Sequence, residues 1–585
     1  MCREGWLSWR EIPVCVGPDI LSVVRPELDG TLPRKAKPEM SQSDQADIKA
    51  PLLSIRDLRI EVRSGDGWRE VVHGVSLDVR RGDILGVIGE SGAGKSTIGL
   101  AAMGYAREGG RIASGSVIFD GVEVTELGEK ALEKIRGVRI AYVAQSAASF
   151  FNPAHTLLDQ FCEVLLRRNM MSKADARAKG QRIYRELGLP DPDNIGDRYP
   201  HQLSGGQLQR AMIAMAMATD PDLIIFDEPT TALDVTTQLD VIASIRDTLA
   251  KSSAAAIYIS HDLALVAQVA THIAVMRHGD LVEYAPTREL LAAPKENYTA
   301  ELIREKVPAI AASTVEKGRY PVLHVEKISA GYGNVVNVLQ DIDLKIDRGS
   351  TVAVVGESGS GKSTLARVIC GLLPAASGHM LFNNRELEPD FRKRSRDTLR
   401  RIQLVYQMPD LALNPRLKIG EVIGRPLEFY HGLSGAKNKA RVIELLETLE
   451  LKPEYFDRYQ SQLSGGEKQR VSIARALAAE PDLIICDEIT SALDQLVAAE
   501  VLKTMARLKS EFGVSYMFIT HDMNTVKAIA DDVVVMRHGK VLDQGPKTAV
   551  FSPPYNAYTE LLLTSTPEMD PDWLDRAMQG RRTLL

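Results

Sequence analysis

One nine-residue glycine-rich string occurs twice in this chain, and its repetition constrains the fold more than any other feature. The string reads GESGAGKST from Gly89 to Thr97 and GESGSGKST from Gly356 to Thr364. The two lysines of the strings, Lys95 and Lys362, lie 267 residues apart. A glutamine, an LSGG serine, a strand-end aspartate and a histidine recur behind each string at spacings of 260 to 262 residues. A unit of about 250 residues is therefore present twice.

This repeat predicts two large domains, at residues 51–303 and 321–565, each big enough to bury a hydrophobic core of its own. Three shorter segments flank these domains, and their composition favours no compact fold. They are predicted to be a flexible extension at 1–50, a linker at 304–320 and an irregular tail at 566–585.

The composition of the chain excludes several classes of protein. With 44% hydrophobic and 25% charged residues it is typical of an ordinary globular protein, and a formal net charge of -6 disfavours nucleic acid as the main partner. No apolar run reaches the ~18 residues that a membrane-spanning helix needs. The first residues lack a basic and then apolar export signal, so we expect a cytoplasmic protein; its true start is Met1 or Met40.

Five cysteines are scattered singly through the sequence, without any CxxC pair. This spacing predicts neither a disulfide framework nor a zinc or iron–sulfur site.

The order of apolar segments predicts an α/β fold in both halves. Each half opens with two strands of alternating hydrophobicity and a fully apolar run that ends at the glycine-rich string. Charged, mostly helical inserts follow, for example at 173–189 and 437–451, and apolar strands then alternate with helices. This alternation is typical of a parallel sheet covered by helices.

The glycine-rich strings match the pattern GxxxxGK[ST] and are predicted to bind the phosphates of a nucleotide. Backbone N–H groups can surround the phosphates because glycine lets the main chain approach closely, and the lysine adds a positive charge. The serine hydroxyl after each lysine is a predicted Mg2+ ligand. The nucleotide-binding residues predicted from the strings are Gly89, Ser91, Gly92, Gly94, Lys95, Ser96, Thr97, Gly356, Ser358, Gly359, Gly361, Lys362, Ser363 and Thr364.

An acid pair ends an apolar strand in each half, in the sequences LIIFDE and LIICDE. Asp227 and Asp487 are predicted to reach the metal ion through water. Glu228 and Glu488 are predicted to be catalytic, since each can orient or deprotonate the water that attacks the γ-phosphate.

A histidine and a glutamine occur in matching register in the two halves. A lone histidine at a strand end is usually structural, but the match with both acid pairs predicts that His261 and His521 bond to the γ-phosphate as catalytic residues. The same register predicts that Gln145 and Gln407 contact Mg2+ and sense the γ-phosphate.

The LSGG motifs each precede a helix, where a serine hydroxyl and bare glycine N–H groups form an anion site. Each motif lies more than 100 residues beyond the phosphate loop of its own half, so it is predicted to serve another loop. The residues concerned are Ser204, Gly205, Gly206, Ser464, Gly465 and Gly466.

With these motifs in the same order in both halves, the chain resembles the ABC transporter ATPases between about residues 51 and 565. The resemblance implies two P-loop NTPase (RecA-like) ABC ATPase domains of α/β class, each with a helical signature subdomain and an N-terminal antiparallel β subdomain. It also implies ATP and Mg2+ as cofactors.

The resemblance further implies a head-to-tail pair of domains with two composite ATP sites. ATP at Lys95 would be closed by the LSGG residues 464–466, and ATP at Lys362 by residues 204–206. Asp234 and Asp494, in the two ALD sequences, would communicate across that interface.

More narrowly, the halves are similar to the two ATPase subunits of oligopeptide/dipeptide (peptide, opine or nickel) importers, joined in one chain. The first half carries MIAMAM and DEPTTALDVTTQ, and the second carries SIARAL and LIICDE. This resemblance implies an ATPase that couples ATP hydrolysis to import of peptides or related solutes from the cytoplasmic face of the inner membrane. Two integral-membrane permease subunits and, indirectly, an extracytoplasmic solute-binding protein would be its partners.

The sequence departs from this family in three places. Residues 285–320 lack the cysteine cluster found in some members, so no iron–sulfur cluster is predicted, and Ile489 replaces the usual proline after the acid pair. Tyr332 is predicted to stack on adenine in the second domain. Val62 occupies the corresponding place in the first domain, where Trp68 is a substitute.

Two other function classes are compatible with the motifs. Soluble tandem ABC ATPases that act on ribosomes or DNA share them, but carry a long charged helical linker, zinc cysteines or an extended coiled coil, which this sequence lacks. A regulatory fusion that binds ATP without turnover is disfavoured by the intact acids. The sequence does not identify the cargo.

Overall fold

The computed structural model describes residues 50–584, apart from residues 66, 232, 305–320, 334–335 and 492. Contacts divide the chain into two compact units. One contains the residues up to Thr230 together with Val241–Thr299, and the other contains Thr231–Asp240 together with the chain from Ala300 onward. The predicted extension before residue 50 and nearly all of the predicted linker lie outside the described residues, and the predicted domain boundaries stay predictions.

The first unit contains two β-sheets. Its strands are β1 (Leu53–Ser64), β2 (Gly67–Val79), β3 (Ile84–Gly89), β4 (Gly110–Phe119), β5 (Val122–Glu123), β6 (Ile140–Val143), β7 (Leu223–Asp227), β8 (Ala255–Ile259), β9 (His272–Arg277) and β10 (Asp280–Pro286). An antiparallel sheet has the order β2-β1-β4-β5, and a six-stranded sheet has the order β10-β9-β3-β8-β7-β6. Strands β9, β3, β8, β7 and β6 run parallel, and β10 is an antiparallel edge strand.

The second unit repeats this topology. Its strands are β11 (Leu323–Tyr332), β12 (Val336–Ile346), β13 (Thr351–Val355), β14 (Ser377–Phe382), β15 (Arg385–Glu386), β16 (Ile402–Val405), β17 (Leu483–Asp487), β18 (Ser515–Ile519), β19 (Asp532–Arg537) and β20 (Lys540–Pro546). The sheet orders are β12-β11-β14-β15 and β20-β19-β13-β18-β17-β16. The predicted fold class, two α/β P-loop domains that each carry an antiparallel β subdomain, is confirmed.

Helices follow the strands in the order that the sequence predicts. They are α2 (Lys95–Ala101), α3 (Glu129–Leu132), α4 (Ala147–Phe150), α5 (Leu157–Arg167), α6 (Lys173–Glu186), α7 (Gly205–Ala216), α8 (Val235–Lys251), α9 (Leu263–Ala267), α10 (Thr287–Ala292), α11 (Asn297–Arg304), α12 (Lys362–Ile369), α13 (Arg396–Arg401), α14 (Pro409–Ala412), α15 (Ile419–His431), α16 (Gly435–Thr448), α17 (Gly465–Leu477), α18 (Gln495–Phe512), α19 (Met523–Ile529), α20 (Lys547–Val550), α21 (Ala557–Thr564) and α22 (Trp573–Leu584). None of these helices, which cover the described part of the chain, is both long and apolar enough to cross a bilayer.

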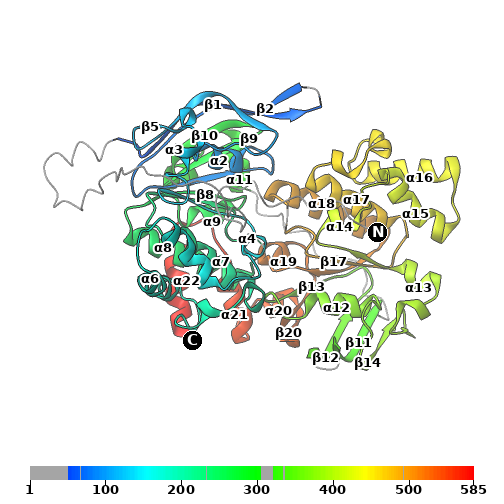
Figure 1. Ribbon diagram of the computed structural model, residues 1–585. Helices are drawn as coiled ribbons and strands as arrows, with labels where there is room; N and C mark the ends of the chain where they lie inside the picture. The colour runs from blue at the N-terminus through cyan, green and yellow to red at the C-terminus, as the bar shows by residue number, and fades with distance from the viewer. Residues whose placement is uncertain are drawn as a thin grey trace. The chain divides into compact units, whose positions relative to one another are not determined.

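The predicted helical inserts form a three-helix group in each unit. Helices α5, α6 and α7 contact one another in the first unit, and α15, α16 and α17, drawn in yellow to orange in Figure 1, contact one another in the second. Side chains cap the helix starts: Thr156 and Ser172 accept the third-position N–H of α5 and α6. Such caps are typically worth about 1 kcal/mol each. The last helix of each group, α7 or α17, begins within an LSGG motif.

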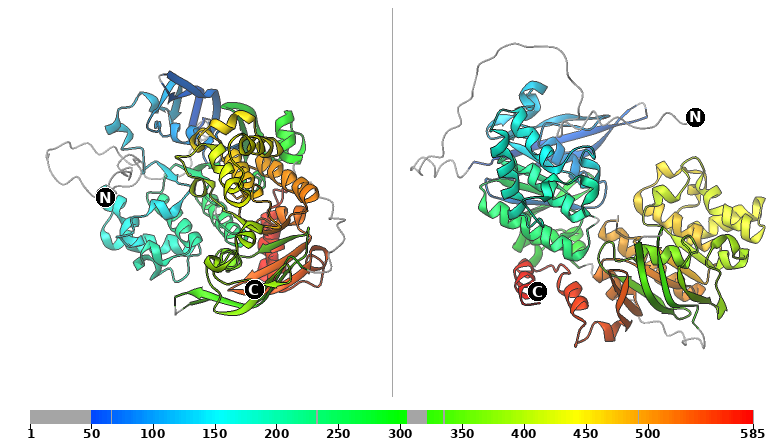
Figure 2. Two further views of the ribbon diagram at one scale, coloured as in Figure 1. Left: turned by 90° about the vertical axis from the view of Figure 1, so that its right-hand side faces the viewer. Right: turned by 60° about the horizontal axis from the view of Figure 1, so that its bottom comes forward.

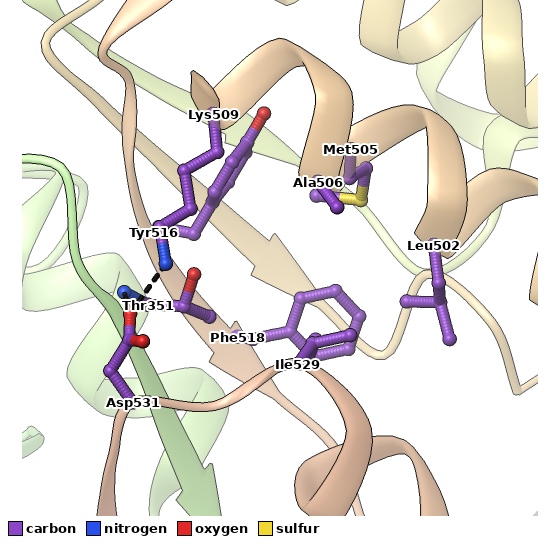
Figure 3. A pocket seen from close by; sticks show the side chains of 9 residues that line it. All are labelled: Thr351, Leu502, Met505, Ala506, Lys509, Tyr516, Phe518, Ile529 and Asp531. Atoms are coloured by element: carbon purple, nitrogen blue, oxygen red, sulfur yellow. Dashed lines mark hydrogen bonds and ion pairs between the residues drawn. The ribbon is translucent and has the colours of Figure 1, made fainter. Parts of the chain in front are cut away.

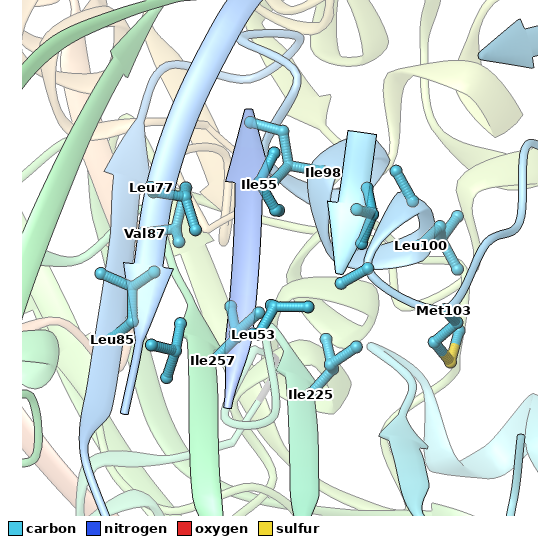
Figure 4. Close-up of a cluster of buried hydrophobic side chains, with 14 of the residues drawn as sticks. Leu53, Ile55, Leu77, Leu85, Val87, Ile98, Leu100, Met103, Ile225 and Ile257 are labelled. Atoms are coloured by element: carbon cyan, nitrogen blue, oxygen red, sulfur yellow. The ribbon is translucent and has the colours of Figure 1, made fainter. Parts of the chain in front are cut away.

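The core of the first unit fixes helix α2 between the two sheets. Figure 4 shows Leu53 and Ile55 of β1, Val87 of β3, Ile257 of β8 and Ile98 of α2 as members of one buried cluster. Each of these side chains is at most 1% exposed, and burying one contributes roughly 1.5–3 kcal/mol. The loop that precedes α2 is therefore held by both sheets.

The expectation of an irregular tail after residue 566 is wrong, because helix α22 covers most of it. The Asp570 carbonyl and carboxylate accept the N–H groups of Trp573 and Asp572, which starts the helix. Trp573 and Leu574 are 5% and 0% exposed, whereas much of the rest of the helix is polar. Two adjacent apolar residues anchor this helix, drawn in red in Figure 2, and they are too few to give a periodic signal in the sequence.

Candidate functional site

Each glycine-rich string forms a loop between a buried strand and a helix. In the first unit the loop leaves β3 at Gly89, and in the second it leaves β13 just before Gly356. These glycines have φ values of 146° and 149°, and a Cβ atom on either would lie 2.0 or 2.1 Å from the carbonyl oxygen of Met276 or Met536. Only glycine fits this turn, because the neighbouring strand is too close for any side chain.

The loop lysines are buried inside their own loops. The Lys95 ammonium donates to the carbonyl oxygens of Gly89 and Glu90 at 2.7 and 2.8 Å, and Lys362 makes the corresponding two bonds at 2.8 Å. Lys95 is 6% exposed and Lys362 is 5% exposed. Burial lowers the pKa of Lys362. Each loop thus holds one positive charge at its centre, where phosphate oxygens would be attracted.

The predicted metal ligands lie together in both units. The Ser96 hydroxyl donates to Oδ1 of Asp227 at 2.7 Å, and the Ser363 hydroxyl donates to Oδ1 of Asp487 at 3.0 Å. Burial raises the pKa of Asp487. Hydroxyl and carboxylate oxygens are the donors that Mg2+ prefers, so these residues fit the predicted ion.

The predicted catalytic residues of the first unit also lie in contact. Oε1 of Glu228 is 3.3 Å from Nδ1 of His261, and Oε2 accepts a bond from Nε2 of Gln145 at 2.7 Å. Burial alone lowers the pKa of His261, but the hydrogen bond and the charge of Glu228 raise it above its usual value. The amide oxygen of Gln145 is the atom of this side chain able to bind a metal ion.

The second unit repeats this arrangement around Glu488. Nδ1 of His521 is 3.5 Å from Oε1, and Nε2 of Gln407 donates to Oε2 at 2.8 Å. Burial on its own raises the pKa of Glu488, whereas His521 and Lys362 lower it more strongly, so the pKa lies below its usual value. The carboxylate is therefore ionised at neutral pH, as a proton acceptor must be.

The backbone at both glutamates is strained. Glu228 and Glu488 have φ values of 49° and 50°, in the left-handed region that non-glycine residues rarely occupy. Their N–H groups donate to Ile259 and Ile519 of the neighbouring strand at 2.9 and 3.0 Å, which holds this conformation. Such strain costs about 1–3 kcal/mol and occurs most often at functional positions.

The LSGG motifs form capped helix starts. Ser204 and Ser464 accept the N–H of Gln207 and Glu467, which in turn bond back to the serine N–H. Burial on its own raises the pKa of Glu467, but the bonds from Tyr455 and Ser464 have the larger effect and lower this pKa below its usual value. The predicted glycines, at 205–206 and 465–466, occupy the first helical positions, where N–H groups have no partner within the helix. The pairing of each motif with the phosphate loop of the other half stays a prediction.

The ALD aspartates cap the helices that follow them. Asp494 accepts the N–H of Val497 at 3.0 Å, and Asp234 accepts bonds from Thr236 and Thr237. Burial on its own raises the pKa of Asp234, and these bonds lower it below its usual value. Their predicted role in communication stays a prediction.

The aromatic residues predicted near adenine are exposed. Tyr332 is 46% exposed at the end of β11, and its hydroxyl accepts a bond from Arg367 at 2.8 Å. Trp68 is 47% exposed and carries the Arg111 guanidinium 4.2 Å from its ring centre, whereas Val62 is half-buried. Stacking of either ring on adenine stays a prediction.

One residue at the first site was missed by the sequence analysis. The hydroxyl of Tyr142, in β6, donates to Oδ2 of Asp227 at 2.5 Å. Burial raises the pKa of Tyr142, so the hydroxyl keeps its proton and acts as a donor. A tyrosine within a buried strand gives no sequence signal that distinguishes it from a core residue.

A cavity near β18 is too small to be a nucleotide site. Figure 3 shows the ion pair of Lys509 and Asp531 on one side of it and the Tyr516 ring on another. Its volume of about 20 Å³ suits a single water molecule. The glycine-rich loops, with their converging lysine, serine and acids, are therefore the better candidates.

Comparison with known proteins agrees with this geometry. A family model described as "ABC transporter" matches residues 72–231 and 339–491, and a model described as "Oligopeptide/dipeptide transporter, C-terminal region" matches residues 543–584. The second match contains helix α22.

Two relatives match along most of the chain. "Peptidoglycan transport ATP-binding protein YejF" of Agrobacterium fabrum is 35% identical over 529 residues, which cover 88% of this chain and 96% of that protein. "Glutathione import ATP-binding protein GsiA" of Salmonella choleraesuis is 34% identical over 575 residues, which cover 91% and 92%.

Proposed function

Because the chain belongs to the ABC transporter family, in the branch of tandem ATPases related to oligopeptide/dipeptide importers, we propose that both of its halves hydrolyse ATP during solute import. The protein is an ATP-hydrolysing, energy-coupling subunit for peptide-like solutes. The observation that best supports two active sites is that each unit holds a glutamate between a histidine and a glutamine.

The residues divide the reaction among them as follows. Loop N–H groups and the lysine of each loop bind the phosphates, and the serine and aspartate would hold Mg2+. A bound Mg2+ would neutralise charge on the phosphates. Glu228 or Glu488 takes a proton from a water molecule while the oxygen of that water attacks the γ-phosphorus. The bond between the β- and γ-phosphates breaks to leave ADP and phosphate. His261 or His521 orients the glutamate and bonds to the γ-phosphate.

The partners follow from the membership of this family. We propose two integral-membrane permease subunits, an extracytoplasmic solute-binding protein that acts indirectly, and a peripheral position on the cytoplasmic face of the inner membrane. The relatives are named for peptidoglycan transport and glutathione import, and both of these compounds contain peptide chains. A solute with a peptide chain is therefore the proposed cargo. Nucleic acid as a partner and an iron–sulfur cluster are not part of this proposal.

Purification from detergent-solubilised native membranes tests this assignment. We expect two membrane proteins to co-purify with the chain, and ATP turnover of that complex to rise when the solute-binding protein and its peptide-like ligand are added. The matched control is a purification at high salt, which weakens charged subunit contacts more than apolar ones. Recovery of ribosomes or DNA instead of permeases would favour the soluble tandem-ATPase alternative.

The ion pair between His521 and Glu488 predicts a pH dependence of stability. Burial on its own lowers the pKa of His521, but Glu488 raises this pKa above its usual value in the folded protein. The protonated histidine therefore stabilises the fold fully below about pH 6.5, and this stabilisation is lost as the pH rises through the folded-state pKa. The pKa of Glu488 is lowered in the folded protein. Its ionised carboxylate therefore stabilises the fold fully above about pH 4.5, and this stabilisation is lost as the pH falls through the folded-state pKa. The pair is thus most stabilising between these values.

Replacing His521 by glutamine should therefore lower the melting temperature of the nucleotide-free protein more at pH 6 than at pH 8.5. For a domain of this size, each kcal/mol lost from the free energy of unfolding lowers the melting temperature by about 2–4 °C. Thermal unfolding of both proteins at the two pH values measures this difference. An equal loss at both would contradict a charged histidine in this pair.

A further inference from the structure

The two predicted metal sites differ in what holds the aspartate. In the first unit, both carboxylate oxygens of Asp227 accept hydrogen bonds, Oδ1 from Ser96 and Oδ2 from Tyr142. Asp227 is 4% exposed and Tyr142 is 9% exposed, so little water competes for either bond. This carboxylate is fixed from two directions.

The second unit has no hydroxyl at the corresponding place. Tyr142 pairs with Ile225, two residues before Asp227, and Leu404 pairs with Ile485, two residues before Asp487. Leu404 therefore holds the same register in β16 that Tyr142 holds in β6. Its aliphatic side chain cannot donate a hydrogen bond.

Asp487 is supported in a different way. Its carboxylate accepts one bond within the described residues, from Ser363 at 3.0 Å, and it lies in the field of two positive charges, first that of Lys362 and then that of Arg367 on α12. In the first unit the residue five positions after the loop lysine is the buried Leu100, whereas in the second it is the exposed Arg367. A surface charge acts on Asp487 without fixing its geometry, while the tyrosine fixes the geometry of Asp227.

We propose that Tyr142 is a positioning residue that orients Asp227 toward the magnesium ion of the first ATP site, and that this gives the first site a tighter hold on the ion than the second. This inference rests on the proposed function, since it requires an ATP site in the first unit. Hydrogen-bond donors behind metal-binding carboxylates fix their orientation, and removing one typically weakens metal binding by about 10–100-fold.

The test is equilibrium binding of a nonhydrolysable ATP analogue to the full chain, with Mg2+ and with EDTA. A Lys362→Ala background weakens the second site, so the first site dominates the titration. Tyr142→Phe keeps the ring and removes the hydroxyl. We expect its affinity with Mg2+ to fall about tenfold, while its affinity in EDTA stays within about twofold of the background.

Tyr516→Phe is the matched control, because Tyr516 is another buried tyrosine whose hydroxyl has no hydrogen-bond partner among the described residues. We expect it to change neither affinity. Equal losses in Mg2+ and EDTA for Tyr142→Phe would assign Tyr142 a purely structural role and overturn the inference, and so would no loss at all. If the background itself binds the analogue in neither condition, the proposed function fails at this site and the inference fails with it.

A gain-of-function variant keeps the test decisive if Tyr142→Phe does not fold. In a Lys95→Ala background, Leu404→Tyr places a hydroxyl in the register of Tyr142 in the second unit. We expect its affinity for the analogue to rise severalfold with Mg2+ and to stay unchanged in EDTA. An unchanged affinity with Mg2+ in a folded protein would count against the inference.

Discussion

Replacing either Glu228 or Glu488 by glutamine is expected to lower ATP turnover by about 10²-fold or more. Glutamine keeps the size and shape of the side chain, but its amide cannot accept the proton of the attacking water. In the second unit the lowered pKa of Glu488 keeps the native side chain ionised, so the substitution removes a charge as well. Phosphate release at saturating Mg-ATP measures the effect.

The size of the loss in each single variant also reports on how the two sites work. A decrease to about half of the native rate would show two independent sites, whereas a decrease of 10²-fold in each would show that both must turn over together.

Binding of ATP should be retained in both variants, which separates loss of chemistry from loss of the site. Glu511→Gln, at an exposed position of α18, is the matched control and should leave turnover unchanged. Full activity in either catalytic variant would refute a two-site ATPase.

The duplicated motifs allowed most of the candidate site to be predicted from sequence. A buried strand such as β3 appears as a continuous apolar run, and glycine must stand at its end because no other residue fits the turn at Gly89. The same order of loop serine and strand-end aspartate in both halves then predicted a common metal site for Ser96 and Asp227, although these residues lie 131 positions apart along the chain. Local periodicity and matching register were sufficient for these residues.

Contacts without a repeated or periodic signal were not predictable in this way. The predicted contact of Gln145 and Gln407 with Mg2+ stays a prediction, and the bonds that their amide nitrogens donate to the two predicted catalytic glutamates were not anticipated. Tyr142 was not identified, since a leucine, Leu404, holds the matching register in the second half, and a comparison of matching positions finds only shared features. Helix α22 was missed because two buried residues anchor it through tertiary contacts that no window of sequence reveals.

The structural basis of the loop turn leads to the second prediction, that replacing Gly356 by alanine will weaken ATP binding by about 10²-fold or more. The added methyl group would lie 2.1 Å from the carbonyl oxygen of Met536, which belongs to strand β19 and cannot move without disturbing the sheet. The loop must shift instead, and the Gly356 carbonyl that holds Lys362 shifts with it. A displacement of about 1 Å in an active site can lower the reaction rate by about 10²-fold, and we expect a loss of similar size in ATP affinity here.

Equilibrium binding of a fluorescent ATP analogue, in a Lys95→Ala background that leaves the second site to report, measures this loss. Gly432→Ala is the matched control, since Gly432 has a φ of 66° but an added Cβ would meet nothing within 4 Å. It carries the cost of a left-handed backbone, roughly 1–2 kcal/mol, without the collision. We expect it to lower stability and to leave ATP affinity unchanged. Near-native affinity in Gly356→Ala would mean that the loop can bind phosphate in a second conformation, and that the close approach to β19 does not determine the nucleotide site.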